Sequence, residues 1–198
     1  MTDKTLPHIV CLDLALANTG VAVLALSPDK DDLLWVDTIH TEKSDKATMR
    51  KGKMKVSDDE WRRVTELVRS LEQALMRWSP CHIFIECPTG GSKSAQAAKS
   101  MALARGAACA VIDGFRTPVT LVTPFEAKKA ATGVSAASKQ DVKKAMRAKF
   151  PTFDGWIVGK RGQVLEGRNE HVYDALSVYM AATTTKSYKE LKNGRDCF

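Results

Sequence analysis

Apolar residues in the first 40 positions fall into three short runs separated by turn-forming residues. The runs cover about 8–16, 20–27 and 33–40, and the breaks between them are Asn18-Thr19-Gly20 and Ser27-Pro28-Asp29-Lys30. Runs of this length that are rich in Val, Leu and Ile are typical of buried strands. Because the connections are short, the pattern predicts an antiparallel meander of three strands.

The next apolar pattern has the spacing of a helix. The segment from Ser57 to Glu60 has the character of a capping box and opens the predicted helix. Its apolar positions are Trp61, Val64, Leu67, Val68, Leu71, Leu75 and Trp78. They form one stripe, which predicts that this side of the helix, including both tryptophans, packs in the core.

A strand at about 81–86 follows this helix, and a helix of that length between two strands is what a parallel crossover requires. The strand is therefore expected beside the first one. An Ala-rich helix from about Lys93 to Asp113 comes next. Its small residues allow close approach, either to the sheet or to a second copy of the chain.

The remaining elements complete a predicted α/β fold. They are a strand at 118–123, helices at 124–131 and 138–149, a loop-like stretch at 151–168 and a final helix at 169–185. Ser138 is the expected N-cap of the second of these helices. The order predicts a five-stranded mixed sheet, with three antiparallel strands followed by two parallel ones, flanked by helices. With 198 residues, the chain is expected to form one domain over 1–198.

Two carboxylates occupy positions in this pattern where apolar side chains are expected. Asp13 interrupts the first apolar run, and Glu86 closes the run that begins at Ile83. An unpaired carboxylate in such a place costs several kcal/mol, so a basic partner or a bound cation is required. The crossover places Glu86 beside Asp13, which makes a shared metal ion the leading interpretation.

The final predicted helix offers further ligand groups. His171 and Asp174 are three residues apart and project from one face of a helix, and Glu170 has a similar relation to Asp174. The spacing leaves open which of Glu170 and His171 faces the site. Oxygen ligands with one imidazole suit Mg²⁺ or Mn²⁺. Two such ions, held roughly 3.5 to 4 Å apart, can activate water and stabilise the leaving oxygen of a phosphodiester.

The charge distribution indicates a polyanionic partner. Residues 1–40 carry a net charge of −4, whereas the whole chain carries +7, so the remainder is strongly basic. Two loops are candidates for DNA contact, 43–56 and 151–168. The first contains Lys43, Lys46, Arg50, Lys51, Lys53 and Lys55, and the second contains Lys160, Arg161 and Arg168.

The cysteines and the absence of long apolar runs indicate an intracellular setting. The five cysteines contain no C-x-x-C pair and are expected to be reduced core residues, as in cytosolic proteins. No run approaches the ~18 apolar residues of a membrane span, and the N-terminus lacks the apolar core of a signal peptide. The expected location is the cytoplasm.

Several of these motifs together resemble the RuvC family of Holliday-junction resolvases. The resemblance rests on Asp13 followed by Ala17-Asn18-Thr19-Gly20, on Glu86 ending a strand, on Ala104-Arg105-Gly106 and on His171-x-x-Asp174-Ala-Leu, and it covers about residues 8–182. It implies an RNase H-like fold, a homodimer whose interface includes the Ala-rich helix, and Mg²⁺-dependent hydrolysis of four-way DNA junctions.

The resemblance also implies roles for individual residues. Asp13, Glu86, His171 and Asp174 are the implied metal ligands and catalytic residues, so that His171 is preferred over Glu170, which is interpreted as a solvated helix residue. Lys128 and Lys139 are similar to the paired lysines of the family near the scissile DNA, and Lys139 is expected to act on the phosphate or on the transition-state charge. Arg105 belongs to the implied DNA-binding set.

The chain departs from the family pattern at two places. The segment after Glu86 reads Cys87-Pro88-Thr89-Gly90-Gly91-Ser92, without the aromatic residues that engage bases near a junction in the family. Leu14-Ala15-Leu16 stands where the family usually has Pro-Gly. We therefore expect relaxed sequence specificity, with other branched DNA also cut.

Two other functions fit parts of the pattern. An actin-like or sugar-kinase-like phosphotransferase also opens with an Asp-bearing strand and a Thr-Gly turn, but it needs a second similar domain, for which 198 residues leave no room. A catalytically silent protein that binds DNA junctions would keep the fold and the basic surface. Such a protein is expected to lack a metal carboxylate, and none is missing here.

Overall fold

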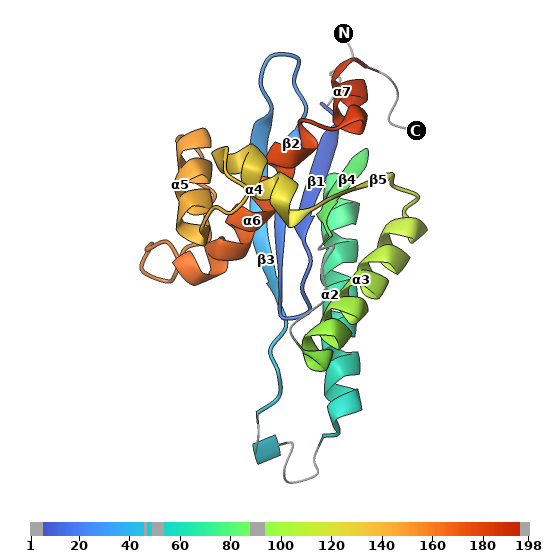
Figure 1. Cartoon of the computed structure of the whole chain (residues 1–198). Coiled ribbons are helices and arrows are strands. Elements are labelled where there is room, and N and C mark those ends of the chain that lie inside the picture. Colours follow the sequence, from blue (N-terminus) through green and yellow to red (C-terminus); the bar gives the residue numbers. More distant parts are fainter. Residues whose placement is uncertain (1–5, 46, 49–53, 88–93, 195–198) are drawn as a thin grey trace.

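The computed structural model describes residues 6–45, 47–48, 54–87 and 94–194. Its five strands form one mixed sheet in the order β3-β2-β1-β4-β5 (Figure 1). They are β1 (His8–Asp13), β2 (Asn18–Ala25), β3 (Asp32–His40), β4 (His82–Glu86) and β5 (Val119–Val122). The first three are antiparallel neighbours, and β4 and β5 run parallel to β1, which confirms the predicted sheet.

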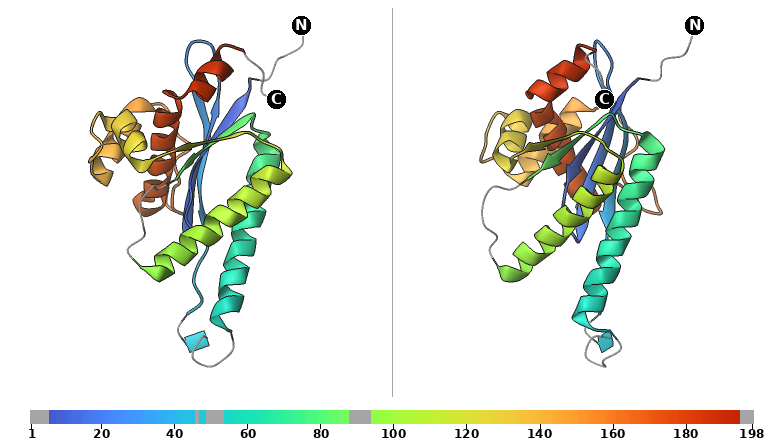
Figure 2. Two further views of the ribbon diagram at one scale, coloured as in Figure 1. Left: turned by 45° about the vertical axis from the view of Figure 1, so that its right-hand side comes forward. Right: turned by 90° about the vertical axis from the view of Figure 1, so that its right-hand side faces the viewer.

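Helices cover both faces of the sheet (Figures 1 and 2). One face carries α2 (Val56–Trp78) and α3 (Ala95–Gly114), and the other carries α4 (Pro124–Thr132), α5 (Lys139–Lys149) and α6 (Glu166–Ala182). A short helix, α7 (Lys186–Lys192), follows α6. Within the described residues, no helix combines the length and the apolar character needed to cross a membrane.

The alternation of side chains along β1 and β4 determines which core each residue joins. Ile9 and Cys11 lie in the core under α6, whereas Val10 and Leu12 lie in the core under α2 and α3. Because successive strand residues point to opposite faces, Asp13 continues the series of Ile9 and Cys11. Glu86 likewise follows Phe84, which is buried in the α6 core. Both carboxylates therefore belong to the α6 face.

The beginning of α2 differs from the prediction. The helix starts at Val56 with Lys55 as its N-cap, so Ser57 lies within the first turn and is not the cap. The carboxylate of Asp58 accepts the backbone N–H of Lys55 at 3.4 Å. The prediction that Trp61 is a core residue is also wrong, since it is 78% exposed. The first turns of α2 extend past the end of the sheet (Figure 1).

Trp78, at the other end of the same stripe, is partly buried and packs beside Trp35, with ring centres 6.1 Å apart.

The cysteines also differ from one another. Cys11 is a core residue as predicted, whereas Cys109 on α3 is exposed. A buried position within a strand is therefore specified more reliably by the pattern than a position on a helix rich in small residues.

The C-terminal part contains two differences from the predicted elements. Helix α6 begins at Glu166 and ends at Ala182, three residues earlier at each end than predicted, and α7 was not predicted as a separate helix. The carboxylate of Asp31, which is 4% exposed, holds α7 to the β2–β3 turn. It accepts hydrogen bonds from Tyr179 at 3.1 Å and from Tyr188, and it pairs with Lys192 at 2.8 Å.

Candidate active site

Asp13 and Glu86 are direct neighbours in the sheet. They are paired across the parallel β1–β4 ladder, each as the last residue of its strand. This confirms the predicted juxtaposition, which followed from the crossover through α2. The C-terminal edge of the two central strands thus carries two carboxylates side by side on the α6 face.

Helix α6 brings His171 and Asp174 to the same place. His171 Nδ1 lies 3.6 Å from Asp13 Oδ2, and ligand atoms of Asp13, His171 and Asp174 all lie within 4.8 Å of one another. All three side chains are partly buried. The group contains His171 and not Glu170, which is the choice that the family resemblance favoured. Glu86 lies outside this group of three, next to Asp13.

A glycine allows α6 to come this close to the sheet. Gly20 of β2 pairs with Asp13 across the β1–β2 ladder. A Cβ atom at Gly20 would lie 1.9 Å from the backbone oxygen of His171. The start of α6 is fixed further along, where the Thr38 hydroxyl donates to the Arg168 carbonyl at 2.7 Å. The sequence motif contains Gly20, but the pattern alone did not indicate that its missing side chain determines the position of α6.

Burial and neighbouring negative charge raise the pKa of two carboxylates of the site. Burial, followed by the charges of Asp13 and Asp174, raises the pKa of Glu86 to about 7. Burial and the charge of Asp13 raise the pKa of Asp174 to about 6. Both burial and charge repulsion therefore disfavour the fully ionised cluster, which a bound cation would stabilise. Oxygen donors with one imidazole, short of positive charge, form a donor set that suits Mg²⁺ or Mn²⁺.

Two lysines supply part of the missing charge. Lys128 on α4 and Lys139 at the start of α5 both lower the pKa of Glu86, and Lys139 also lowers that of Asp174. Lys139 forms an ion pair with Glu170 at the rim of the site. The interpretation of Glu170 as merely solvated is therefore incomplete. No signal within α6 could have identified this contact, because its partner belongs to another helix.

The other predicted DNA-binding residues lie away from the cluster or outside the described residues. Arg50, Lys51 and Lys53 lie outside the described residues. Lys55 is exposed at the start of α2, off the same end of the sheet at which β1 and β3 end (Figure 1). Arg105 is on α3, on the opposite face from α6, where it lines a pocket of about 460 Å³ whose margin includes Glu86.

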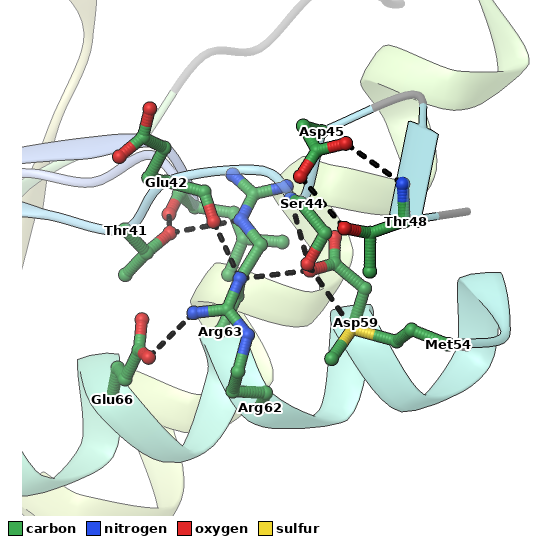
Figure 3. Close-up of polar contacts among 11 residues, drawn as sticks. Thr41, Glu42, Ser44, Asp45, Thr48, Met54, Asp59, Arg62, Arg63 and Glu66 are labelled. Carbon is green, nitrogen blue, oxygen red and sulfur yellow. Dashed lines mark hydrogen bonds and ion pairs between the residues drawn. The ribbon is translucent and has the colours of Figure 1, made fainter. Parts of the chain in front are cut away.

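A polar network fixes the described base of the basic loop onto α2 (Figure 3). Asp59, which is 1% exposed, accepts hydrogen bonds from the Ser44 hydroxyl at 2.6 Å and from Arg62 at 2.8 Å. Arg62 also donates to the Glu42 carbonyl, and Arg63 donates to the Thr41 hydroxyl at 3.0 Å. The segment that leaves β3 is therefore attached to the first turns of α2.

A family model matches the part of the chain that precedes α6. The model of the family described as crossover junction endodeoxyribonuclease RuvC matches residues 9–150. A search of curated protein sequences gives no match.

Two solved structures share the fold. Thermus thermophilus RuvC in complex with a Holliday junction substrate is 18% identical, with a TM-score of 0.67, over 96% of this chain and 97% of that one. The yeast mitochondrial Holliday junction resolvase Ydc2 is 14% identical, with a TM-score of 0.54, over 98% of this chain and 84% of that one. At these identities the likeness concerns the arrangement of the sheet and its helices.

Proposed function

Since this chain belongs to the RuvC family of crossover junction endodeoxyribonucleases, we propose that it resolves four-way DNA junctions by metal-dependent hydrolysis of phosphodiesters. The observation that carries the metal part of the proposal is the convergence of Asp13, His171 and Asp174 within 4.8 Å, with Glu86 beside Asp13. Three elements distant in sequence contribute to this cluster. A purely structural role would leave part of the repulsion within this cluster uncompensated.

Asp13, Glu86, His171 and Asp174 are the proposed ligands of two Mg²⁺ ions. Asp13 is next to Glu86 on one side and close to His171 and Asp174 on the other, so it lies centrally among the four proposed ligands. Bound there, Mg²⁺ would supply the Lewis acidity that lowers the pKa of a water molecule and stabilises the leaving oxygen. The chain's own contribution is to hold the four ligands on rigid elements.

Lys139 and Lys128 are proposed to act on the phosphate. Lys139 is exposed at the rim, with its side chain 60% accessible, so a phosphate oxygen can reach its ammonium group. A cation placed there favours the extra negative charge of the phosphoryl transition state. The basic loop 43–56 leaves the sheet at the end that carries Asp13. It is the proposed contact to a DNA arm, with Lys55 at its base.

The remaining parts of the proposal concern assembly and specificity. Resolution of a junction needs two cuts, which two copies of the chain would supply, and α3 with its small exposed residues is the candidate interface. Because the stretch after Glu86 carries no aromatic residue as far as Ser92, we propose that the cuts depend weakly on base sequence. The cytoplasm is the proposed location.

The test is cleavage of a synthetic mobile four-way junction with end-labelled strands. The unmodified chain with Mg²⁺ is expected to nick the junction, while Asp13→Asn and Asp174→Asn lose cleavage by at least about 100-fold and still bind it. Glu72→Gln, an exposed carboxylate on α2, is the matched control and is expected to cleave normally. Tight binding without any nicking by the unmodified chain would contradict the proposal and favour the silent binder.

A further inference from the structure

Helices α5 and α6 face each other with rows of opposite charge. Lys139, Lys143 and Arg147 are spaced four residues apart on α5, and Glu166, Glu170 and Asp174 are spaced four apart on α6. Side chains at this spacing lie on one face of a helix. The acidic row ends at Asp174, which is a proposed metal ligand, and the basic row ends at Lys139.

The contacts between the rows run antiparallel. Glu166 pairs with Lys143 at 3.0 Å and with Arg147 at 3.6 Å, and Glu170, one turn further along α6, pairs with Lys139. Helix α5 begins at Lys139, so its row has no further basic residue opposite the next acidic residue, Asp174. Lys139 is therefore the basic residue of the row that reaches both Glu170 and the charge of Asp174.

The end of the rows remote from the site is well anchored. Arg147 donates to the Tyr173 hydroxyl at 2.8 Å, and its guanidinium lies 4.2 Å from the ring centre of Trp156. By contrast, the side chains of Lys139 and Glu170 are 60% and 44% exposed. Exposed pairs of this kind contribute little to stability. The Glu170 contact matters because of the position in which it holds the Lys139 ammonium.

We propose that Glu170 is a positioning residue that keeps the Lys139 ammonium at the rim and off the metal-binding carboxylates. Without Glu170, the ammonium would still be attracted by Asp174 and Asp13, whose charges both raise the pKa of Lys139. An ammonium on either carboxylate would compete with the cation. This inference rests on the proposed function, because it assigns the cation to the Asp13–His171–Asp174 group.

The test measures cation binding without DNA, by electron paramagnetic resonance of added Mn²⁺. Glu170→Gln is expected to weaken Mn²⁺ binding by about three- to tenfold. In a Lys139→Ala background, the same substitution is expected to change binding by less than about twofold, since no ammonium remains to compete. The control is Glu166→Gln, the neighbouring acidic residue of the row, which is expected to leave Mn²⁺ binding unchanged.

The double substitution separates the explanations. If Glu170→Gln weakened Mn²⁺ binding equally with and without Lys139, Glu170 would act through its own charge, and the inference would be overturned. Unchanged binding in Glu170→Gln alone would overturn it as well. Coupling between the two residues in Mn²⁺ binding, together with failure of the unmodified chain to cut a junction, would instead refute the proposed function and leave the positioning role intact.

Discussion

The Cα atom of Gly20 faces the backbone carbonyl of His171 so closely that a Cβ atom at Gly20 would lie 1.9 Å from the oxygen. This contact couples β2 to the helix that carries two of the four proposed metal ligands. The neighbouring atom is backbone, which cannot rotate aside as a side chain does. The distance between α6 and the sheet is therefore limited by the absence of a single methyl group.

Gly20→Ala is expected to push α6 away from Asp13. We expect a loss of about 1–3 kcal/mol in the free energy of unfolding, as for other overpacked sites, and cleavage reduced by at least about 100-fold. Thermal denaturation and junction cleavage measure the two effects. Gly167→Ala is the control, since a Cβ there meets nothing within 4 Å and its helix should be stabilised by about 0.5–1 kcal/mol. Normal cleavage by Gly20→Ala would contradict this account.

The raised pKa values predict an unusual dependence of stability on pH without metal. The pKa rises from 4.5 to about 7 for Glu86 and from 3.8 to about 6 for Asp174. A carboxyl group whose folded pKa is raised contributes its stability below the unfolded value and loses it as pH rises through the folded value. These two groups should therefore destabilise the metal-free protein progressively between about pH 4 and pH 7.

Denaturant unfolding of Glu86→Gln against the unmodified chain measures this effect. At pH 8 without metal, the variant is expected to be more stable by about 1–3 kcal/mol, and the difference should vanish near pH 4. Mg²⁺ at pH 8 should raise the free energy of unfolding of the unmodified chain, and should raise that of Glu86→Gln by less. A difference between the two chains that is constant with pH would show that charge repulsion is not its cause.

The buried Asp31 predicts a separate effect on stability. Asp31→Asn weakens the pairing of Lys192 and the hydrogen bonds from Tyr179 and Tyr188, and is expected to cost about 3–5 kcal/mol. Asp32→Asn, on an exposed neighbour, is expected to cost less than about 0.5 kcal/mol. Calorimetric melting compares the two. Equal melting temperatures would mean that α7 is not held by this carboxylate.

The network at Asp59 predicts a change in DNA affinity. Asp59→Asn should release Ser44 and Arg62 and loosen the base of loop 43–56, raising the Kd for a junction by about three- to tenfold. The maximal cleavage rate should change little. Glu66→Gln, which removes the other carboxylate partner of Arg62, serves as the control.

Fluorescence anisotropy over a range of salt concentrations checks this prediction. The affinity of the unmodified chain should fall steeply with salt, because phosphate contacts release counterions. In Asp59→Asn the dependence of affinity on salt should be shallower, since fewer lysines of the loop would contact the phosphates of the DNA. An affinity and a salt slope identical to those of the unmodified chain would exclude the loop as a contact.

The sheet and the carboxylates were predictable from local periodicity. The interruption of two apolar runs singled out Asp13 and Glu86, and the crossover made them neighbours, as the β1–β4 pairing shows. The spacing of three on α6 indicated His171 with Asp174. The identity of the inward residue came from the family resemblance, because Glu170 satisfies the spacing rule equally well.

The features that the sequence did not predict are contacts between separate elements. The closeness of Gly20 to His171 and the pairing of Glu170 with Lys139 depend on how α6 and α5 are placed after folding. Trp61 shows the same limit in the opposite direction. Its position in the apolar stripe is regular, but the sheet ends before it, so the tryptophan remains exposed.

Asp13 lies near the beginning of the described chain and Asp174 near its end, and yet they share one group of ligands. A ribosome must therefore translate through α6 before the proposed site can assemble. On the proposed function, a partly synthesised chain that lacks α6 cannot cut DNA. The nuclease would become active only when its last long helix docks, which separates the making of the protein from its capacity to break chromosomes.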